Sequence, residues 1–176
     1  MTSRTSANPL IIILLAALLG GAAGAGGYVG WQVWSEREPD LRPEFSLEDL
    51  DGNMRSITEW DGKVVVLNFW GSWCPPCVHE IPMFMALQDE YGEQGLQFVG
   101  VALDRLEDAR AFYEELEVNY PSMVGVHEPT VIGEKYGNER GTLPYTVIID
   151  RDGRIVERFD REVTREQIEP KIREYL

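Results

Sequence analysis

The sequence predicts an α/β domain built around a mixed β-sheet, and three observations support this prediction. Apolar runs of strand length occur at 64–70, 96–103 and 145–150. Segments with helical periodicity or helix-start signals follow them, at 74–91, 107–116 and 164–176. Strand, helix, strand and helix, followed by a hairpin and a last helix, is the order of an α/β sandwich around a mixed sheet.

Turn and capping signals place the remaining elements. The pairs Asp51-Gly52 and Asp152-Gly153 predict two hairpins. Their arms are residues 45–50 with 53–57, and residues 145–150 with 154–159. Thr164 and Gln167 have the spacing of a capping box at the start of the closing helix. We also expect a short extended segment at 120–124 and a short helix at 128–136.

Composition and charge restrict the class of function. The chain has 176 residues and a formal net charge of -14, with 26% charged and 44% hydrophobic residues. This length suits one globular domain with an N-terminal appendage. An acidic domain repels phosphate backbones, so nucleic acid is not expected as a partner.

The N-terminal segment predicts a membrane anchor. Residues 9–34 contain no charged side chain, and as a helix they would be about 39 Å long, enough to cross a bilayer core of roughly 30 Å. Trp31 and Trp34 suit the far interface, and Arg4 marks the cytoplasmic side. The alternative is a signal peptide cleaved near Ala23-Gly24-Ala25. Both interpretations export the domain, and we divide the chain into an anchor (1–35), a linker (36–43) and a globular domain (44–176).

Cys74 and Cys77 are the only cysteines, and they form a Cys-x-x-Cys pair directly after the apolar run at 64–70. Cys74 precedes a proline, so we expect it to be extended and to cap the following helix. Free N–H groups and the helix dipole there stabilise a thiolate. The pattern predicts that Cys74 attacks a partner disulfide and that Cys77, one turn inward, resolves the mixed disulfide.

Glu80 and the two histidines each have a functional and a structural interpretation. Glu80, one turn beyond Cys77, could exchange the proton of Cys77, or it could be a solvated helix glutamate. A structural zinc site needs four ligands, and only His79 and His127 could join the cysteines. Haem attachment requires histidine directly after the second cysteine, where this chain has Val78. We therefore expect no metal and no cofactor beyond the redox-active Cys74–Cys77 disulfide.

Two spaced motifs, at residues 63–82 and 141–153, resemble the TlpA/ResA-like branch of the thioredoxin superfamily. The resemblance covers roughly residue 41 to the C-terminus. It implies a thioredoxin-like fold and a cis Leu143–Pro144 bond that faces the dithiol, where neighbouring backbone would pair with an extended partner segment. It also implies that Glu80 is the acidic residue of the site.

The chain differs from related groups of proteins at positions that distinguish their functions. Thioredoxins themselves carry a buried aspartate six residues before the first cysteine, whereas this chain has Asn68, as is usual in the TlpA/ResA branch. The proton-handling role is therefore assigned to Glu80. Members of the CcmG type, which act in cytochrome c maturation, have a glutamate after the cis-proline, where this chain has Tyr145. Copper-delivery relatives use Cys-x-x-x-Cys, and peroxiredoxins lack the Trp-Cys-x-x-Cys arrangement.

We expect an apolar rim around the sulfurs that suits an extended polypeptide, with Pro144 adjoining it. Its members are Trp70, Trp73, Pro75, Leu143 and Tyr145, of which Trp70 is expected to be buried. The predicted protein is a thiol–disulfide oxidoreductase on a single-pass anchor in the cytoplasmic membrane, with its domain outside the cytoplasm. The resemblance implies protein disulfides as substrates and a DsbD/CcdA-like membrane thiol transporter as electron donor. The alternatives are a CcmG-type role, a copper-binding module that uses His127, and a non-catalytic interaction domain.

Overall fold

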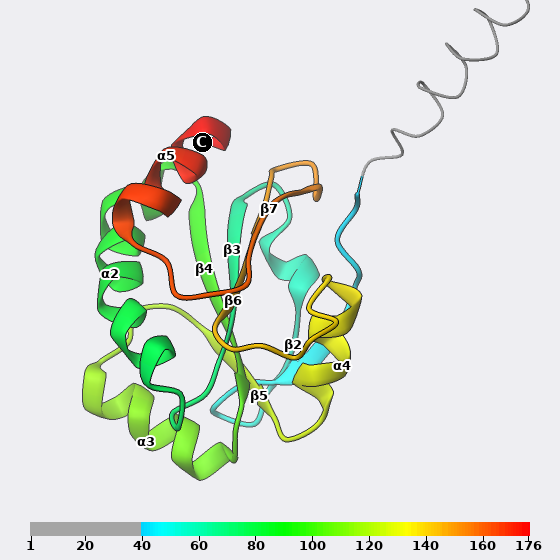
Figure 1. The fold of residues 1–176 in the computed structure, drawn as a ribbon, viewed down its shortest axis with the longest axis vertical. Helices are drawn as coiled ribbons and strands as arrows, with labels where there is room; N and C mark the ends of the chain where they lie inside the picture. The colour runs from blue at the N-terminus through cyan, green and yellow to red at the C-terminus, as the bar shows by residue number, and fades with distance from the viewer. Residues whose placement is uncertain (1–39) are drawn as a thin grey trace, which may run out of the picture. The chain divides into compact units, whose positions relative to one another are not determined.

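The computed structural model describes residues 40–176. Five strands form a sheet in the order β5-β4-β3-β6-β7 (Figure 1). They are β3 (Val64–Trp70), β4 (Leu96–Leu103), β5 (Ser122–Gly125), β6 (Tyr145–Ile149) and β7 (Ile155–Phe159). Strand β4 runs parallel to β3 and to β5, whereas β6 runs antiparallel to β3 and to β7. The mixed sheet expected from the sequence is confirmed.

The central strand β3 is covered on both faces. All seven of its residues are buried. Successive side chains point to opposite faces of a strand. Val64, Val66 and Trp70 accordingly join one hydrophobic cluster, while Val65, Leu67 and Phe69 join the other. The continuous apolar run in the sequence therefore reflects burial on both sides.

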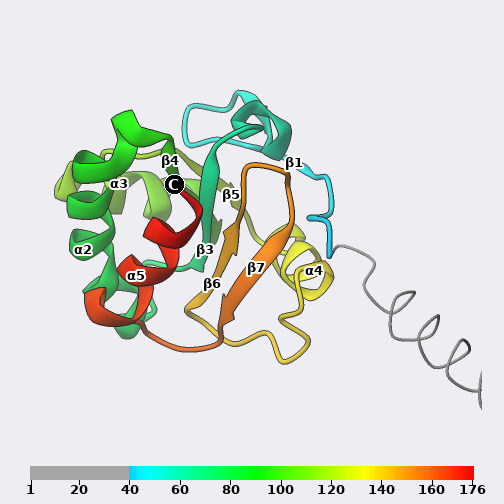
Figure 2. The same ribbon diagram turned by 90° about the horizontal axis from the view of Figure 1, so that it is seen from above.

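Helices cover the two faces unequally. On one face lie α2 (Pro75–Tyr91), α3 (Leu106–Leu116) and α5 (Arg165–Tyr175), which supply buried residues to the same cluster as Val64. On the other face lie α4 (Glu128–Lys135) and the N-terminal hairpin (Figure 2). Thr164 caps α5, and its capping box with Gln167 is formed as predicted.

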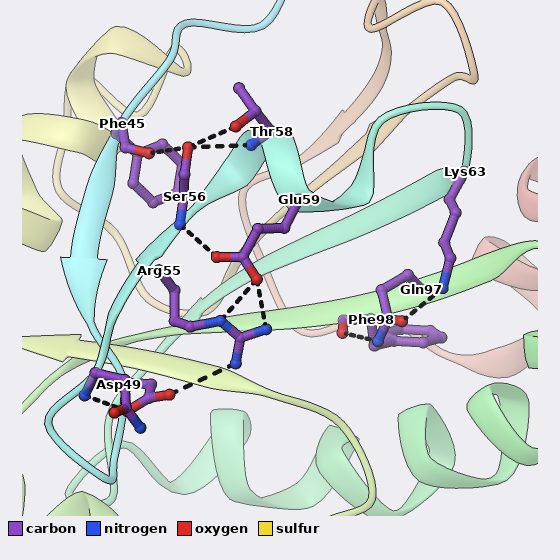
Figure 3. Close-up of polar contacts among 10 residues, drawn as sticks. Phe45, Asp49, Arg55, Ser56, Thr58, Glu59, Lys63, Gln97 and Phe98 are labelled. Atoms are coloured by element: carbon purple, nitrogen blue, oxygen red, sulfur yellow. Dashed lines mark hydrogen bonds and ion pairs between the residues drawn. The ribbon is translucent and has the colours of Figure 1, made fainter.

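The N-terminal hairpin is stabilised by a chain of polar contacts. It consists of β1 (Ser46–Glu48), β2 (Met54–Ser56) and the short 3₁₀ helix η1 (Ile57–Trp60). Ser56 and Glu59 form a capping box, in which the Ser56 N–H donates to Glu59 Oε1 at 2.9 Å (Figure 3). Arg55 pairs with Glu59 at 2.7 Å and approaches Asp49 to 3.5 Å. Asp49 in turn forms an isolated bridge with Met123, which holds the hairpin against β5.

Residues 40–43, expected to belong to a linker, lie against the domain. The Ile155 N–H donates to the Asp40 carbonyl at 2.7 Å, and the Arg42 N–H donates to the Gly153 carbonyl at 2.9 Å. The Tyr136 hydroxyl donates to the Pro43 carbonyl at 2.6 Å. Charged and proline residues made this segment resemble a spacer, yet its extended backbone hydrogen-bonds to the turn between β6 and β7.

The predicted anchor at 1–35 lies outside the described residues. Within residues 40–176, no helix is both long enough and apolar enough to span a membrane.

Gly100 in β4 provides a test of the packing beneath the sheet. A Cβ atom at Gly100 would approach Ser122 Oγ to 2.6 Å and Trp70 Nε1 to 2.9 Å. These two atoms form a buried hydrogen bond of 3.1 Å. We predict that Gly100→Ala lowers the free energy of unfolding by about 1–3 kcal/mol, measured by denaturant titration.

Gly133→Ala is the matched control, because a Cβ atom there meets nothing closer than 3.7 Å. Gly133 lies in α4, where alanine is favoured over glycine by about 1 kcal/mol, so this variant should be neutral or more stable. Equal destabilisation by both substitutions would contradict the packing account.

Candidate active site

The two cysteines lie where β3 leads into α2. Cys74 is extended and caps the helix, and Pro75 and Pro76 occupy the first turn. Prolines are tolerated there because the first amides of a helix have no intrahelical partner. Cys74 and Cys77 are joined in a disulfide. Cys77 is 0% exposed and Cys74 is 4% exposed, so only Cys74 retains any contact with solvent.

Two side chains hold the loop before Cys74 to the end of β4. Asp104 Oδ2 accepts hydrogen bonds from the Ser72 N–H at 2.8 Å and from the Ser72 hydroxyl at 2.7 Å. The Trp73 indole N–H donates to the Leu103 carbonyl at 3.0 Å, although Trp73 is 62% exposed. Sequence reasoning missed Asp104. Its position directly after a strand parallel to β3 was the available signal, because parallel strands end at the same edge of a sheet.

Glu80 is a buried carboxyl one turn beyond Cys77. It is 2% exposed, and its two oxygens accept different donors. Asn68 Nδ2 donates to Oε1 at 2.8 Å, and the Val163 N–H donates to Oε2 at 3.2 Å. Burial raises the pKa of Glu80 to about 8, while these two hydrogen bonds oppose the rise and the nearby charge of Glu162 adds to it. Glu80 is therefore buried and is not a solvated helix glutamate.

Asn68 connects Glu80 to the strand that follows Pro144. Its Nδ2 group also donates to Thr146 Oγ1 at 3.0 Å, and the two residues are paired between β3 and β6. Asn68 Oδ1 is buried and has no hydrogen-bond partner within residues 40–176. Sequence reasoning gives Asn68 no role, yet its amide orients the acidic group. Its place between Val66 and Trp70 in the alternation of β3 indicates the face on which it lies.

The Leu143–Pro144 peptide bond is cis, as the resemblance implied. Phe69 pairs with Tyr145, so the start of β6 lies beside the end of β3, at the sheet edge that carries the cysteine loop. Pro144 is buried. Leu143 is half-buried and packs against the hydrophobic cluster that contains both cysteines.

The predicted apolar rim is only partly present at the surface. Trp73 and Pro75 are exposed, and Trp70 is buried as expected. Tyr145 is 3% exposed, and its hydroxyl donates to the Tyr136 carbonyl at 3.1 Å. The Tyr145 side chain therefore belongs to the core on the α4 side of the sheet and not to the rim. The alternation of β6 is the reason, because Thr146 is the residue that faces α2.

Both histidines are exposed, whereas the two cysteines are buried. His79 is exposed, with its ring nitrogen 3.9 Å from Glu162, and His127 is exposed at the start of α4. In the part of the chain from residue 40 onward, no group of three or more histidine, cysteine or acidic side chains is placed to hold a metal ion.

The raised pKa of Glu80 predicts a pH-dependent stability for the oxidised protein. Between about pH 4.5 and 8 the carboxyl is ionised in the unfolded chain but protonated in the folded one, so unfolding releases a proton. This group therefore lowers the free energy of unfolding as pH rises through that range. Glu80→Gln should match the wild type near about pH 5 and be more stable by a few kcal/mol near about pH 9.

Thermal or denaturant unfolding across this pH range measures the difference. Glu93→Gln, which alters an exposed glutamate just after α2, is the control and should leave the pH profile as in the wild type. Parallel profiles for Glu80→Gln and the wild type would contradict the assignment of a neutral buried carboxyl.

Comparisons with known proteins agree with this architecture. A family model described as the AhpC/TSA family matches residues 40–158. The thiol-disulfide oxidoreductase ResA of Bacillus cereus is 35% identical over 162 residues, which cover 90% of each chain. A thiol:disulfide interchange protein of the thioredoxin family from Chlorobium tepidum superposes with a TM-score of 0.70 at 26% identity, covering 78% of this chain and 97% of that one.

A secreted thiol-disulfide isomerase from Corynebacterium glutamicum superposes with a TM-score of 0.66 at 26% identity, covering 73% of this chain and 80% of that one. Together with the fold and the Cys74–Cys77 pair, these similarities identify the class of protein. The chain therefore belongs to the AhpC/TSA family and is a thiol–disulfide oxidoreductase with a thioredoxin-like fold.

Proposed function

We propose that this protein is a membrane-anchored, extracytoplasmic reductant of disulfides in protein partners. The observation that carries the proposal is the arrangement at the start of α2, where Cys77 is fully buried and a buried carboxyl, Glu80, follows one turn later. A disulfide with a purely structural role does not require a buried carboxyl beside it. Burial removes water from the carboxyl and so makes its ionised form costly.

The reaction begins from the reduced dithiol. The Cys74 thiolate, stabilised by the free N–H groups at the start of α2, attacks one sulfur of the partner's disulfide, and the other sulfur leaves as a thiolate. The Cys77 thiolate then attacks the Cys74 sulfur, forms the Cys74–Cys77 disulfide and releases the partner's second thiolate. Two electrons pass to the partner, whose two thiolates take up protons.

Glu80 is the base for Cys77 in this scheme. Residues three apart on a helix lie on the same face, so Glu80 and Cys77 are neighbours along α2. Burial raises the pKa of Glu80 to about 8, close to neutral pH, so this carboxyl can take a proton from Cys77 and return it under physiological conditions. Asn68 and the Val163 N–H act as positioning groups, because they fix the two carboxyl oxygens.

The location and the electron donor are inferred from the sequence and the relatives. The uncharged run at 9–34 supports an anchor, and similarity to a secreted thiol-disulfide isomerase supports a domain outside the cytoplasm. An oxidised Cys74–Cys77 pair must be reduced again after each turnover. We propose a DsbD/CcdA-like membrane thiol transporter as the donor, because the reducing equivalents must cross the membrane.

Single cysteine variants test the order of events. Cys74→Ser should lower the rate of insulin disulfide reduction by about 100-fold or more, because the attacking thiolate is lost. Cys77→Ser should accumulate mixed disulfides with the substrate, visible as slower bands on a non-reducing gel. In the control with both substitutions these bands should be absent, and turnover by Cys74→Ser at the wild-type rate would sink the mechanism.

Fractionation tests the anchor. We predict that the full chain, expressed in a bacterium, stays in the membrane pellet after an alkaline carbonate wash, because a spanning helix resists extraction. A chain that begins at residue 36 should be found in the soluble fraction. Recovery of the full-length gene product as a soluble species cleaved near Ala23-Gly24-Ala25 would replace the anchor with a signal peptide.

A further inference from the structure

A groove of about 490 Å³ lies beside the cysteine loop, between the N-terminal hairpin and the ends of β4 and β5. Asp104 belongs both to this groove and to the site, because it lines the groove and accepts the two hydrogen bonds from Ser72. The hydrogen bonds between Asp104 and Ser72 therefore join the groove to the loop that carries Cys74.

Exposed apolar side chains concentrate on this side of the dithiol. Met54 is 65% exposed and Val126 is 54% exposed, and both line the groove. Trp73, at 62% exposed, rests its indole N–H on the carbonyl of Leu103, the residue before Asp104. Three of the five large apolar side chains that are exposed within residues 40–176 thus lie in or beside the groove. Such a concentration marks a binding surface more often than scattered single residues do.

The charge of the groove is entirely acidic. Its lining includes Glu48, Asp104 and Glu128, and among residues 40–176 no lysine or arginine lines it. Asp104 is already engaged by Ser72 and by the Arg105 N–H. Backbone N–H groups, including its own and that of His127, lower the pKa of Glu128, so this carboxylate is ionised at neutral pH. Glu48 and Glu128 remain exposed to receive a basic side chain.

The hairpin wall of the groove is fixed in place. Figure 3 shows Arg55 between Asp49 and Glu59, and the capping box of Ser56 next to it. The Arg110 guanidinium donates to the Leu50 carbonyl at 2.7 Å through Nε, which ties the hairpin to α3. A groove with rigid walls costs little conformational entropy when it is filled.

We propose that this groove binds an extended segment of the partner polypeptide, with an apolar side chain against Met54 and Val126 and a lysine or arginine near Glu48 and Glu128. The proposal rests on the reductase function proposed above and names the class of substrate that the enzyme prefers. The partner cysteine lies on this segment and is presented to Cys74, while the groove selects the residues that flank it.

Three synthetic peptides test the preference with the full-length protein. Each carries one cysteine as a mixed disulfide with 2-mercaptoethanol. The first has leucine and lysine on both sides of the cysteine, the second replaces lysine by glutamate, and the third replaces leucine by serine. The ratio of kcat/KM for each peptide to that for 2-hydroxyethyl disulfide is measured. We expect the leucine–lysine peptide to exceed the other two by about tenfold.

Matched double variants locate the preference on the protein. Met54→Ser with Val126→Ser should remove the advantage of leucine, and Glu48→Gln with Glu128→Gln should remove the advantage of lysine. Leu41→Ser with Val131→Ser is the control, since these side chains are 57% and 53% exposed and do not line the groove. The control should keep both preferences.

Equal ratios for the three peptides, or preferences that survive both groove variants, would overturn the proposal while leaving the reductase function intact. Failure of the wild type to reduce 2-hydroxyethyl disulfide would instead show that the proposed function itself is wrong.

Discussion

The hydrogen bond between Asn68 and Glu80 joins the sheet to the helix that bears the cysteines, and the rest of the site is arranged around it. The same amide of Asn68 reaches Thr146, two residues after Pro144, and the other oxygen of Glu80 accepts from Val163 at the approach to α5. The carboxyl thus fixes three elements relative to one another. Because β3 is buried on both faces, the site inherits the rigidity of the core.

Burying the Glu80 carboxyl costs folding free energy, and its proposed role in proton transfer explains why it lies there. Within residues 40–176, ionised Glu80 has two hydrogen-bond donors and no cationic partner, so desolvation dominates and its pKa rises. The neutral form is therefore favoured over most of the physiological range. A carboxyl whose pKa lies near neutral pH can take a proton during one step of a thiol–disulfide exchange and return it later.

The reactive sulfurs and the proposed binding groove occupy neighbouring but different parts of the surface. The sulfurs lie at the end of β3, where Cys77 is shielded and Cys74 is barely accessible. Asp104 links this reactive loop to the neighbouring acidic groove, so a partner held in the groove is also held near Cys74. The proposed binding residues lie in the N-terminal hairpin, after β5 and at the start of α4, so none of them belongs to the loop or the helix that carries the cysteines.

Most of the fold could be predicted from the sequence, because apolar runs, Asp-Gly turns and the Thr164 capping box are local signals. The cysteines and Glu80 were also found, since they lie within two turns of one helix. Long-range register decided the rest. The pairing of β3 with β6 turns Tyr145 into the core and brings Thr146 to Asn68, and strand adjacency brings Asp104 to Ser72. No local pattern records these contacts, which is why the rim assignment failed for Tyr145.

The reduction potential of the Cys74–Cys77 pair is the most direct measure of the central claim that this dithiol donates electrons to protein disulfides. The full-length protein would be equilibrated with glutathione or dithiothreitol buffers, with metal content determined on the same sample. A dithiol that reduces protein disulfides should have a potential near that of thioredoxin, about -270 mV, with no bound metal. A potential near about -120 mV would contradict this claim, because such a pair oxidises its partners.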